Sequence, residues 1–134
     1  MRKATGSFSV TLTPQAVEPG VGPAGIGRFS LHKQYQGDLQ AEALGQMLAI
    51  RTPVDGSAAY VALEGVEGEL HGRRGGFSLH HRGIMDRSSP ALEVWVVPDS
   101  GTGALAGIRG RLDIRIEGKA HFYDLEYELP QTQE

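Results

Sequence analysis

Residues 108–129 read IRGRLDIRIEGKAHFYDLEYEL, and this stretch decides the fold class. Apolar and polar residues alternate on both sides of Gly118, and a period of two is typical of β-strands, whose successive side chains point to opposite faces. A hairpin turn near Gly118 makes one face apolar and the other charged. The apolar face would carry Ile108, Leu112, Ile114, Ile116, Tyr123, Leu125, Tyr127 and Leu129. The stretch therefore predicts two antiparallel strands, half-buried against a core.

A second hairpin is predicted around Arg73 and Arg74. Centring its turn on these residues pairs Leu70 with Phe77, Gly68 with Leu79, and Val66 with His81. All six positions then lie on one face, as expected for strands that share a core.

The same alternation continues through residues 7–13 and 29–32, and turns are indicated at Gly37-Asp38 and Asp55-Gly56. A long loop is predicted from Pro14 to Gly27, which is rich in proline and glycine. Residues 38–48 are ambiguous, because Ala, Leu, Glu, Gln and Met favour a helix. The count is seven or eight strands with short connections, and closure into a barrel is favoured because it removes exposed edges.

Composition restricts the function classes. The 134 residues, with a net charge of −3, predict one domain over 1–134 with a short tail at 131–134. Mild acidity argues against binding nucleic acid. Without Cys there are no disulfides or thiolate sites. The N-terminus has no signal-peptide core, and no apolar run is long enough for a membrane helix, so a cytoplasmic location without membrane association is expected.

Several blocks of the chain resemble a bacterial family of unknown function. These blocks are Ala4 to Phe8, Gly56 to Glu64, Leu70 to Arg73, Gly76 to Gly83, Val96 to Gly107, and Tyr123 to Pro130. The most specific is Pro98-Asp99-Ser100-Gly101-Thr102-Gly103. The resemblance spans nearly the whole chain.

The resemblance implies a fold but no agreed activity. The family is similar to the allene oxide cyclase barrel, in which eight antiparallel strands follow one another in meander order. Dirigent proteins and spirotetronate cyclases share the Gly-Thr-Gly turn of this barrel type. The resemblance therefore implies that Leu39 to Arg51 is a strand and that the chain is an all-β, closed antiparallel eight-stranded barrel.

The glycine block and the histidines give weak signals for cofactors. Residues 101–106 formally match a relaxed dinucleotide fingerprint, but that motif needs a helix directly after the turn. Here residues 108–117 alternate as a strand, so a tight corner is expected and no cofactor. His80 and His81 are adjacent and would point to opposite faces, while the other histidines lie on separate segments. No metal site is predicted.

Glu64 and His81 are the candidate catalytic residues. By the predicted register both lie on the apolar face, one diagonal step apart. A carboxylate there is costly unless it is paired or hydrogen-bonded. The pair could act as general base and acid or polarise a bound ligand. It could instead have a structural role, in which the two side chains satisfy each other's hydrogen-bonding requirements and fix the barrel register.

Further residues suggest a pocket and a partner. The predicted ligand-binding residues, which share the inward phase, are Tyr60, Phe77, Leu79, Tyr123 and Tyr127. Trp95 and Val97 lie on the other face of strand 92–97. An exposed Trp95 is unusual unless a second subunit or the loop from Pro14 to Gly27 covers it, and a homodimer through that face is favoured. The arginines around 73 and 74 are more typical of a solvated hairpin tip than of an anion site.

Three functions remain open. The first is a module that binds a small apolar or amphipathic molecule in the barrel lumen. The second is an isomerase or cyclase that uses Glu64 or His81 to move a proton or stabilise charge. The third is a structural oligomeric protein with a filled core.

Overall fold

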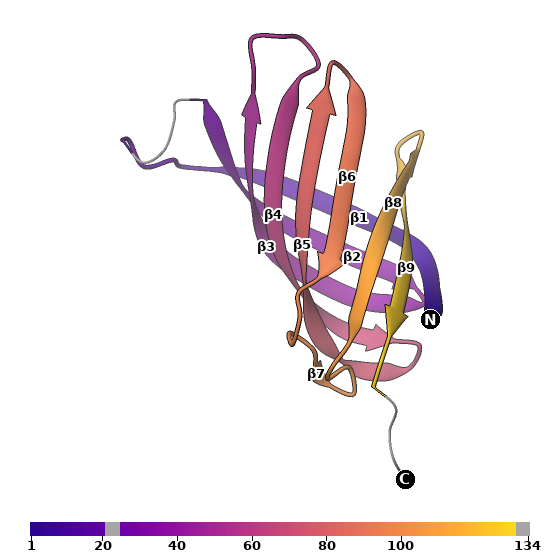
Figure 1. Ribbon diagram of the computed structural model, residues 1–134. Coiled ribbons are helices and arrows are strands. Elements are labelled where there is room, and N and C mark those ends of the chain that lie inside the picture. The colour runs from indigo at the N-terminus through magenta and orange to yellow at the C-terminus, as the bar shows by residue number, and fades with distance from the viewer. Residues whose placement is uncertain (21–24, 131–134) are drawn as a thin grey trace.

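The structure, a computed structural model, describes residues 1–20 and 25–130, and within these ranges it is entirely β (Figure 1). Nine strands are present in the described residues. Their bounds are β1 Arg2–Gln15, β2 Ile26–Gly37, β3 Leu39–Arg51, β4 Ala58–Leu70, β5 Arg73–Asp86, β6 Ser89–Val96, β7 Thr102–Gly103, β8 Arg109–Glu117 and β9 Ala120–Glu128.

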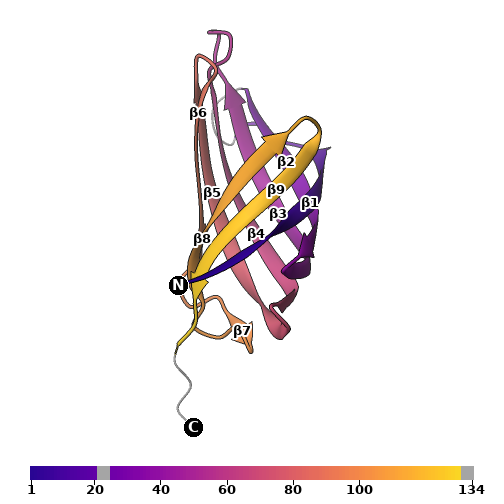
Figure 2. The ribbon, with the colours of Figure 1, turned by 90° about the vertical axis from the view of Figure 1, so that its right-hand side faces the viewer.

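Eight long strands close into a barrel. The hydrogen-bonded order is β4-β3-β2-β1-β9-β8-β6-β5, and β4 also pairs with β5, which completes the ring. All pairings are antiparallel, so the predicted closed meander is confirmed. Figure 2 shows the barrel from the side of β8 and β9. The seam between β6 and β8 is the thinnest, with the single ladder pair Trp95 and Arg111.

The ambiguous segment is strand β3, as the family resemblance implied. Its alternating burial sends Leu39, Ala41 and Ala43 inward and leaves the intervening residues exposed. Tertiary packing on the pleated surface therefore overrides the helix propensity of its Ala, Leu and Gln residues.

The predicted register of the β4–β5 hairpin is wrong by four positions. The turn is centred on His71 and Gly72, so Val66 pairs with Phe77 and Ala62 pairs with His81. Positive φ angles of 48° at His71 and 78° at Gly72 allow this tighter connection. Because the error is an even number, every side chain still lies on its predicted face.

The predicted loop at 14–27 is too long. β1 continues through Pro14 to Gln15, and β2 already begins at Ile26. Pro14 is tolerated because β9 pairs with β1 only as far as Phe8, so its missing N–H lies on an unpaired edge. Residues 21–24 of the loop and the tail at 131–134 lie outside the described residues.

The end of the barrel that lies lowest in Figure 1 is filled by side chains and covered by the connection between β6 and β8, which we call the plug. Its core includes Tyr35, Leu70, Phe77, Leu79 and Leu125, each less than 4% exposed. The connection that follows β6 contributes two further fully buried side chains, Leu105 and Ile108. The lower end therefore contains a filled core.

The predicted glycine corner forms this plug. The short strand β7 pairs with Gly75 and Gly76 of β5. A Cβ on Gly75 would overlap the backbone carbonyl of Thr102, so this close approach requires glycine. The strand β8, not a helix, follows at Arg109. Across the described ranges, no helix is long and apolar enough to cross a membrane.

Candidate functional site

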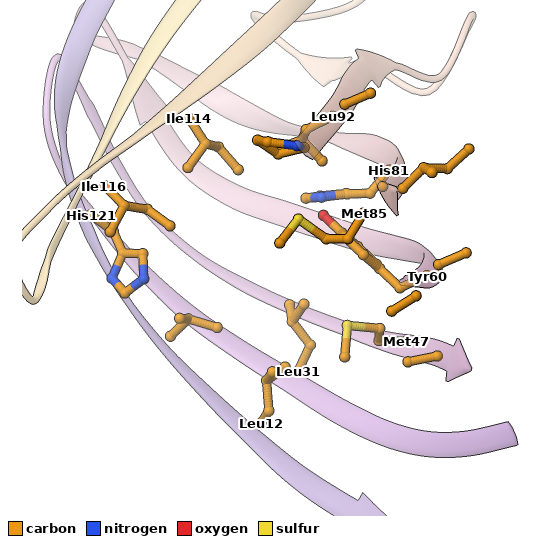
Figure 3. A pocket seen from close by; sticks show the side chains of 18 of the residues that line it. Leu12, Leu31, Met47, Tyr60, His81, Met85, Leu92, Ile114, Ile116 and His121 are labelled. Atoms are coloured by element: carbon orange, nitrogen blue, oxygen red, sulfur yellow. The ribbon is translucent and has the colours of Figure 1, made fainter. Parts of the chain in front are cut away.

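The half of the barrel that lies uppermost in Figure 1 contains a cavity of about 460 Å³ that is open to solvent (Figure 3). Its walls are mostly aliphatic or thioether side chains, which converge on a shared space in the close-up view. Examples are Leu12, Leu31, Met47, Met85, Leu92 and Ile114. Five polar side chains also line it, those of Lys33, Arg51, Tyr60, His81 and His121. The cavity therefore combines an apolar wall with a small number of polar groups.

Glu64 is the centre of a buried polar cluster next to this cavity. Lys33 Nζ donates to its Oε2 over 2.8 Å, and the Tyr35 hydroxyl donates to its Oε1 over 2.5 Å. His81 Nε2 lies 2.6 Å from Oε2. The exposed fractions of Lys33, Glu64 and His81 are 3%, 2% and 5%, so the cluster is almost fully removed from solvent. We refer to these four residues as the Glu64 cluster.

Small residues on β3 make the Glu64 cluster possible. Lys33 and Tyr35 are on β2 and Glu64 is on β4, so β3 lies between them. On the inner face, Lys33 pairs with Ala43, and Glu64 pairs with Gly45. A Cβ on Gly45 would lie 2.8 Å from Glu64 Cα and would crowd the glutamate. The missing side chain therefore leaves room for Lys33 and Glu64 to meet across β3.

The electrostatics keep Glu64 ionised. Burial by itself raises the pKa of Glu64, but the hydrogen bond from His81 and the charge of Lys33 together outweigh it and lower the pKa to about 2. An ionised carboxylate only accepts hydrogen bonds, so His81 Nε2 carries the proton that it shares. Burial and the nearby negative charge raise the pKa of Tyr35 well above its usual value of 10.0. The cluster is an ion pair with two additional donors.

Tyr60 joins the cluster to the cavity wall. It pairs with Gly83 across β4 and β5, and a Cβ on Gly83 would overlap its ring. The ring centroid lies 6.3 Å from that of His81. Burial and the charge of Glu64 raise the pKa of Tyr60 to about 12, so it is a neutral hydrogen-bonding group at neutral pH.

The structure separates the predicted site residues into two groups. Tyr60 and His81 line the cavity, and Glu64 lies behind His81, to which it is hydrogen-bonded. The other predicted ligand-binding residues, Phe77, Leu79, Tyr123 and Tyr127, belong to the packed core cluster and are not among the residues that line the cavity. They are inward-facing, as expected, but lie toward the filled end of the barrel.

The two deeper tyrosines make structural hydrogen bonds. The Tyr123 hydroxyl accepts a hydrogen bond from Leu39 N over 2.8 Å and donates to a backbone carbonyl. The Tyr127 hydroxyl lies 2.5 Å from His71 Nδ1. Both are satisfied within the protein and tie the core to neighbouring strands.

Sequence reasoning missed Lys33 and Tyr35. The sequence pattern could have identified them, because Phe29, Leu31, Lys33 and Tyr35 are alternate residues of one strand and therefore lie on the same, inward face. A lysine on the apolar face of a strand needs a buried anion, and Glu64 was already a candidate of that type.

The other sequence candidates lie apart from the cavity. Trp95 is on the outer surface and 42% exposed, with the Arg111 guanidinium 5.6 Å from its ring, and Val97 follows the end of β6. Arg74 pairs with Glu69 at the hairpin tip. Within residues 1–20 and 25–130, no three or more His, Asp or Glu side chains gather as a metal site would require.

These features define a class of protein, a small closed antiparallel β-barrel whose apolar cavity adjoins a buried ionic cluster. The family model "Protein of unknown function (DUF3224)" matches residues 4–127, so the chain belongs to the DUF3224 family. This confirms the predicted membership of a family of unknown function. The likeness to allene oxide cyclases in particular stays a prediction.

A solved structure supports the same assignment. The crystal structure of a protein with unknown function from the DUF3224 family, from Shewanella oneidensis MR-1 at 1.84 Å resolution, is similar to this chain with a TM-score of 0.91 and 43% sequence identity. The match covers 98% of this chain and 99% of that one. Among curated proteins, none matches this chain.

Proposed function

We propose that the barrel binds one small amphipathic molecule, with the apolar body in the upper cavity and the polar end at Lys33 and His81. The observation that carries this proposal is the cavity of about 460 Å³, whose lining is mostly apolar and includes Lys33 and His81 of the Glu64 cluster. Small-molecule sites typically have volumes of roughly 300–1,000 Å³, mostly apolar walls and a few polar groups that fix orientation. A purely structural barrel would have no need for this space.

The unused hydrogen-bonding capacity suggests what the polar end is. The Lys33 ammonium has three N–H donors, of which one points to Glu64 and one to the Tyr35 hydroxyl at 3.3 Å. His81 uses Nε2 for Glu64, and within the described residues its Nδ1 makes no hydrogen bond. A ligand hydroxyl could donate to Nδ1 and accept from Lys33. A carboxylate could accept from Lys33 alone.

The electrostatics favour binding over catalysis. An isomerase or cyclase would need Glu64 or His81 to move a proton or stabilise charge. A carboxyl group whose pKa is lowered to about 2 is a weak base at neutral pH, and its oxygens already accept three hydrogen bonds. Glu64 is therefore better suited to orienting Lys33 and His81 than to reacting with a substrate.

The test measures binding to the cavity directly. Native mass spectrometry of the purified protein would detect a retained molecule, and decanol and decanoic acid would compete with a fluorescent naphthalene sulfonate dye. Ala49 lines the cavity, so Ala49→Phe should fill part of it and weaken dye binding at least tenfold. Val17→Phe, at an exposed position outside the cavity lining, is the matched control and should bind normally.

Three results would contradict the proposal. These are no binding by the parent protein, equal binding by Ala49→Phe, or loss of binding in the Val17→Phe control. Conversion of a retained molecule during incubation would instead support the enzyme hypothesis.

A further inference from the structure

One part of the cavity lining presents hydrogen-bonding groups that the protein itself leaves unused. The His81 ring and the Tyr60 hydroxyl point into the cavity, and their ring centroids are 6.3 Å apart (Figure 3). Lys33 lines the same space. Within the described residues, His81 Nδ1, the Tyr60 hydroxyl and one N–H of Lys33 make no hydrogen bond. We refer to these three residues as the polar wall.

We propose that the ligand is an aliphatic alcohol, whose hydroxyl group donates to His81 Nδ1 and accepts from Lys33 or Tyr60. This inference rests on the proposed binding function and narrows it to one class of ligand. A hydroxyl group is both a donor and an acceptor, and it is neutral. Carboxylates, amines and ketones each fail to meet one requirement of the polar wall.

The hydrogen bond between His81 and Glu64 makes Nδ1 an acceptor. The ionised carboxylate of Glu64 only accepts hydrogen bonds, so the proton of a neutral His81 is on Nε2, and Nδ1 keeps its lone pair. A ligand that displaces water from Nδ1 must therefore supply a donor, since an unpaired polar group in a desolvated site is costly. A hydroxyl group supplies one. A ketone, an ester or an ionised carboxylate does not.

Charge balance argues against an anionic ligand at the polar wall. Lys33 and Glu64 already form an ion pair, and the two residues are 3% and 2% exposed. A carboxylate bound to Lys33 would place two anions around one ammonium group, in surroundings where an unpaired charge is costly. His81 would have to take up a second proton before such a ligand was both compensated and fully hydrogen-bonded.

Charge balance also argues against a cationic ligand. An alkylammonium group at the polar wall would approach Lys33, which carries the same charge. The nearby anion, Glu64, already accepts three hydrogen bonds and lies behind His81. The polar wall therefore favours a neutral donor. A hydroxyl group also adds little polar surface to a lining that is mostly aliphatic.

The two remaining polar side chains of the lining lie outside the polar wall. Arg51 is the last residue of β3 and is exposed. His121 packs against Phe8, with 5.2 Å between ring centroids, and lies across the cavity from His81 (Figure 3). An acid bound in the reverse direction would place its carboxylate at Arg51 and its apolar chain against the polar wall. That orientation would leave His81 Nδ1 unpaired, a cost that the alcohol avoids.

Ligands with the same number of carbon atoms test the class. Displacement of the naphthalene sulfonate dye is measured for 1-decanol, 2-decanone, decanoate and decylamine at about pH 8, where an ordinary imidazole is neutral. Decanol should bind at least about tenfold more tightly than each of the others. The ketone leaves Nδ1 unpaired, and the two ions add a charge that the polar wall does not balance.

Substitution of His81 tests the atom that receives the hydroxyl group. His81→Gln keeps an N–H for Glu64 at the position of Nε2 but has no atom in place of Nδ1. Its affinity for decanol should fall about tenfold, whereas its affinity for 2-decanone should change less than about threefold. Ala49→Phe is the matched control, because it fills part of the cavity, keeps His81 and should weaken both ligands. Circular dichroism checks the fold, and the ligand series with the parent protein decides the class even if His81→Gln does not fold.

The outcomes separate this inference from the proposed function. Failure of all four ligands and the dye to bind would overturn both. If 2-decanone or decanoate binds as tightly as decanol and Ala49→Phe weakens each of them, the cavity binds ligands and the assignment to alcohols is wrong. Tight decanoate binding that Arg51→Gln abolishes would show the reverse orientation and would also overturn it. So would equal losses of decanol and 2-decanone affinity in a folded His81→Gln protein.

Discussion

Lys33 and Glu64 form an ion pair across a strand that separates them. The Nζ and Oε2 atoms are 2.8 Å apart, although Lys33 is on β2 and Glu64 is on β4. The pair passes over Ala43 and Gly45 of β3, and its two side chains are 4% and 0% exposed. One interaction therefore fixes the relative positions of three strands and presents a cationic group to the cavity.

Removal of the cation should destabilise the barrel strongly. Lys33→Met keeps much of the side-chain volume but leaves Glu64 with less compensation, and breaking a buried ion pair in this way typically costs about 3–5 kcal/mol. The free energy of unfolding, measured by urea denaturation, should fall by that amount. The double variant Lys33→Met with Glu64→Gln should lose less than the sum of the single variants. A loss below about 1 kcal/mol in Lys33→Met would show that the pair is not desolvated.

The lowered pKa of Glu64 predicts an acid-dependent stability. The pKa is about 2 in the folded protein and 4.5 for the ordinary group, so the contribution of Glu64 is complete above pH 4.5 and is lost as the pH falls toward 2. The shift corresponds to roughly 3 kcal/mol. The parent protein should therefore lose stability more steeply than Glu64→Gln over this window. Parallel slopes for the two proteins would contradict the assignment.

The fold was predictable because the pattern that defines it is local. Alternation gave the correct faces even where the register of the β4–β5 hairpin was wrong, since an even error preserves the face of every side chain. For this reason Glu64 and His81 were found together, although His81 pairs with Ala62 and not with Val66.

The cavity and its cation were harder to predict. Lys33 follows the inward phase of Leu31, but one strand alone does not reveal which anion it meets two strands away. Whether the lumen is open depends on side-chain volumes summed over eight strands and on the plug after β6. Tyr123 and Tyr127 share the inward phase with Tyr60 and still belong to the filled end, because alternation specifies the face and not the depth.

Gly75 should be intolerant of any side chain. A Cβ there would overlap the Thr102 carbonyl, which is backbone and cannot rotate away. Gly75→Ala should therefore displace the plug that holds Leu105 and Ile108, with a loss of about 1–3 kcal/mol in the free energy of unfolding. Gly65→Ala is the matched control in the neighbouring strand, since its Cβ has open space, and should cost much less. Equal losses for both variants would show that the corner does not depend on this contact.

Gly83 should control the position of the Tyr60 ring, and with it the shape of the cavity. A Cβ on Gly83 would overlap the ring atoms Cδ1 and Cε1, so Gly83→Ala should push Tyr60 toward the cavity that it lines. We expect weaker binding of the naphthalene sulfonate dye, by about tenfold, together with a loss of roughly 1–3 kcal/mol in stability from overpacking. Adding Tyr60→Leu removes the ring from the overlap, and the double variant should recover stability relative to Gly83→Ala alone. Additive losses in the free energy of unfolding would mean that the alanine methyl group strains the backbone instead of displacing the ring.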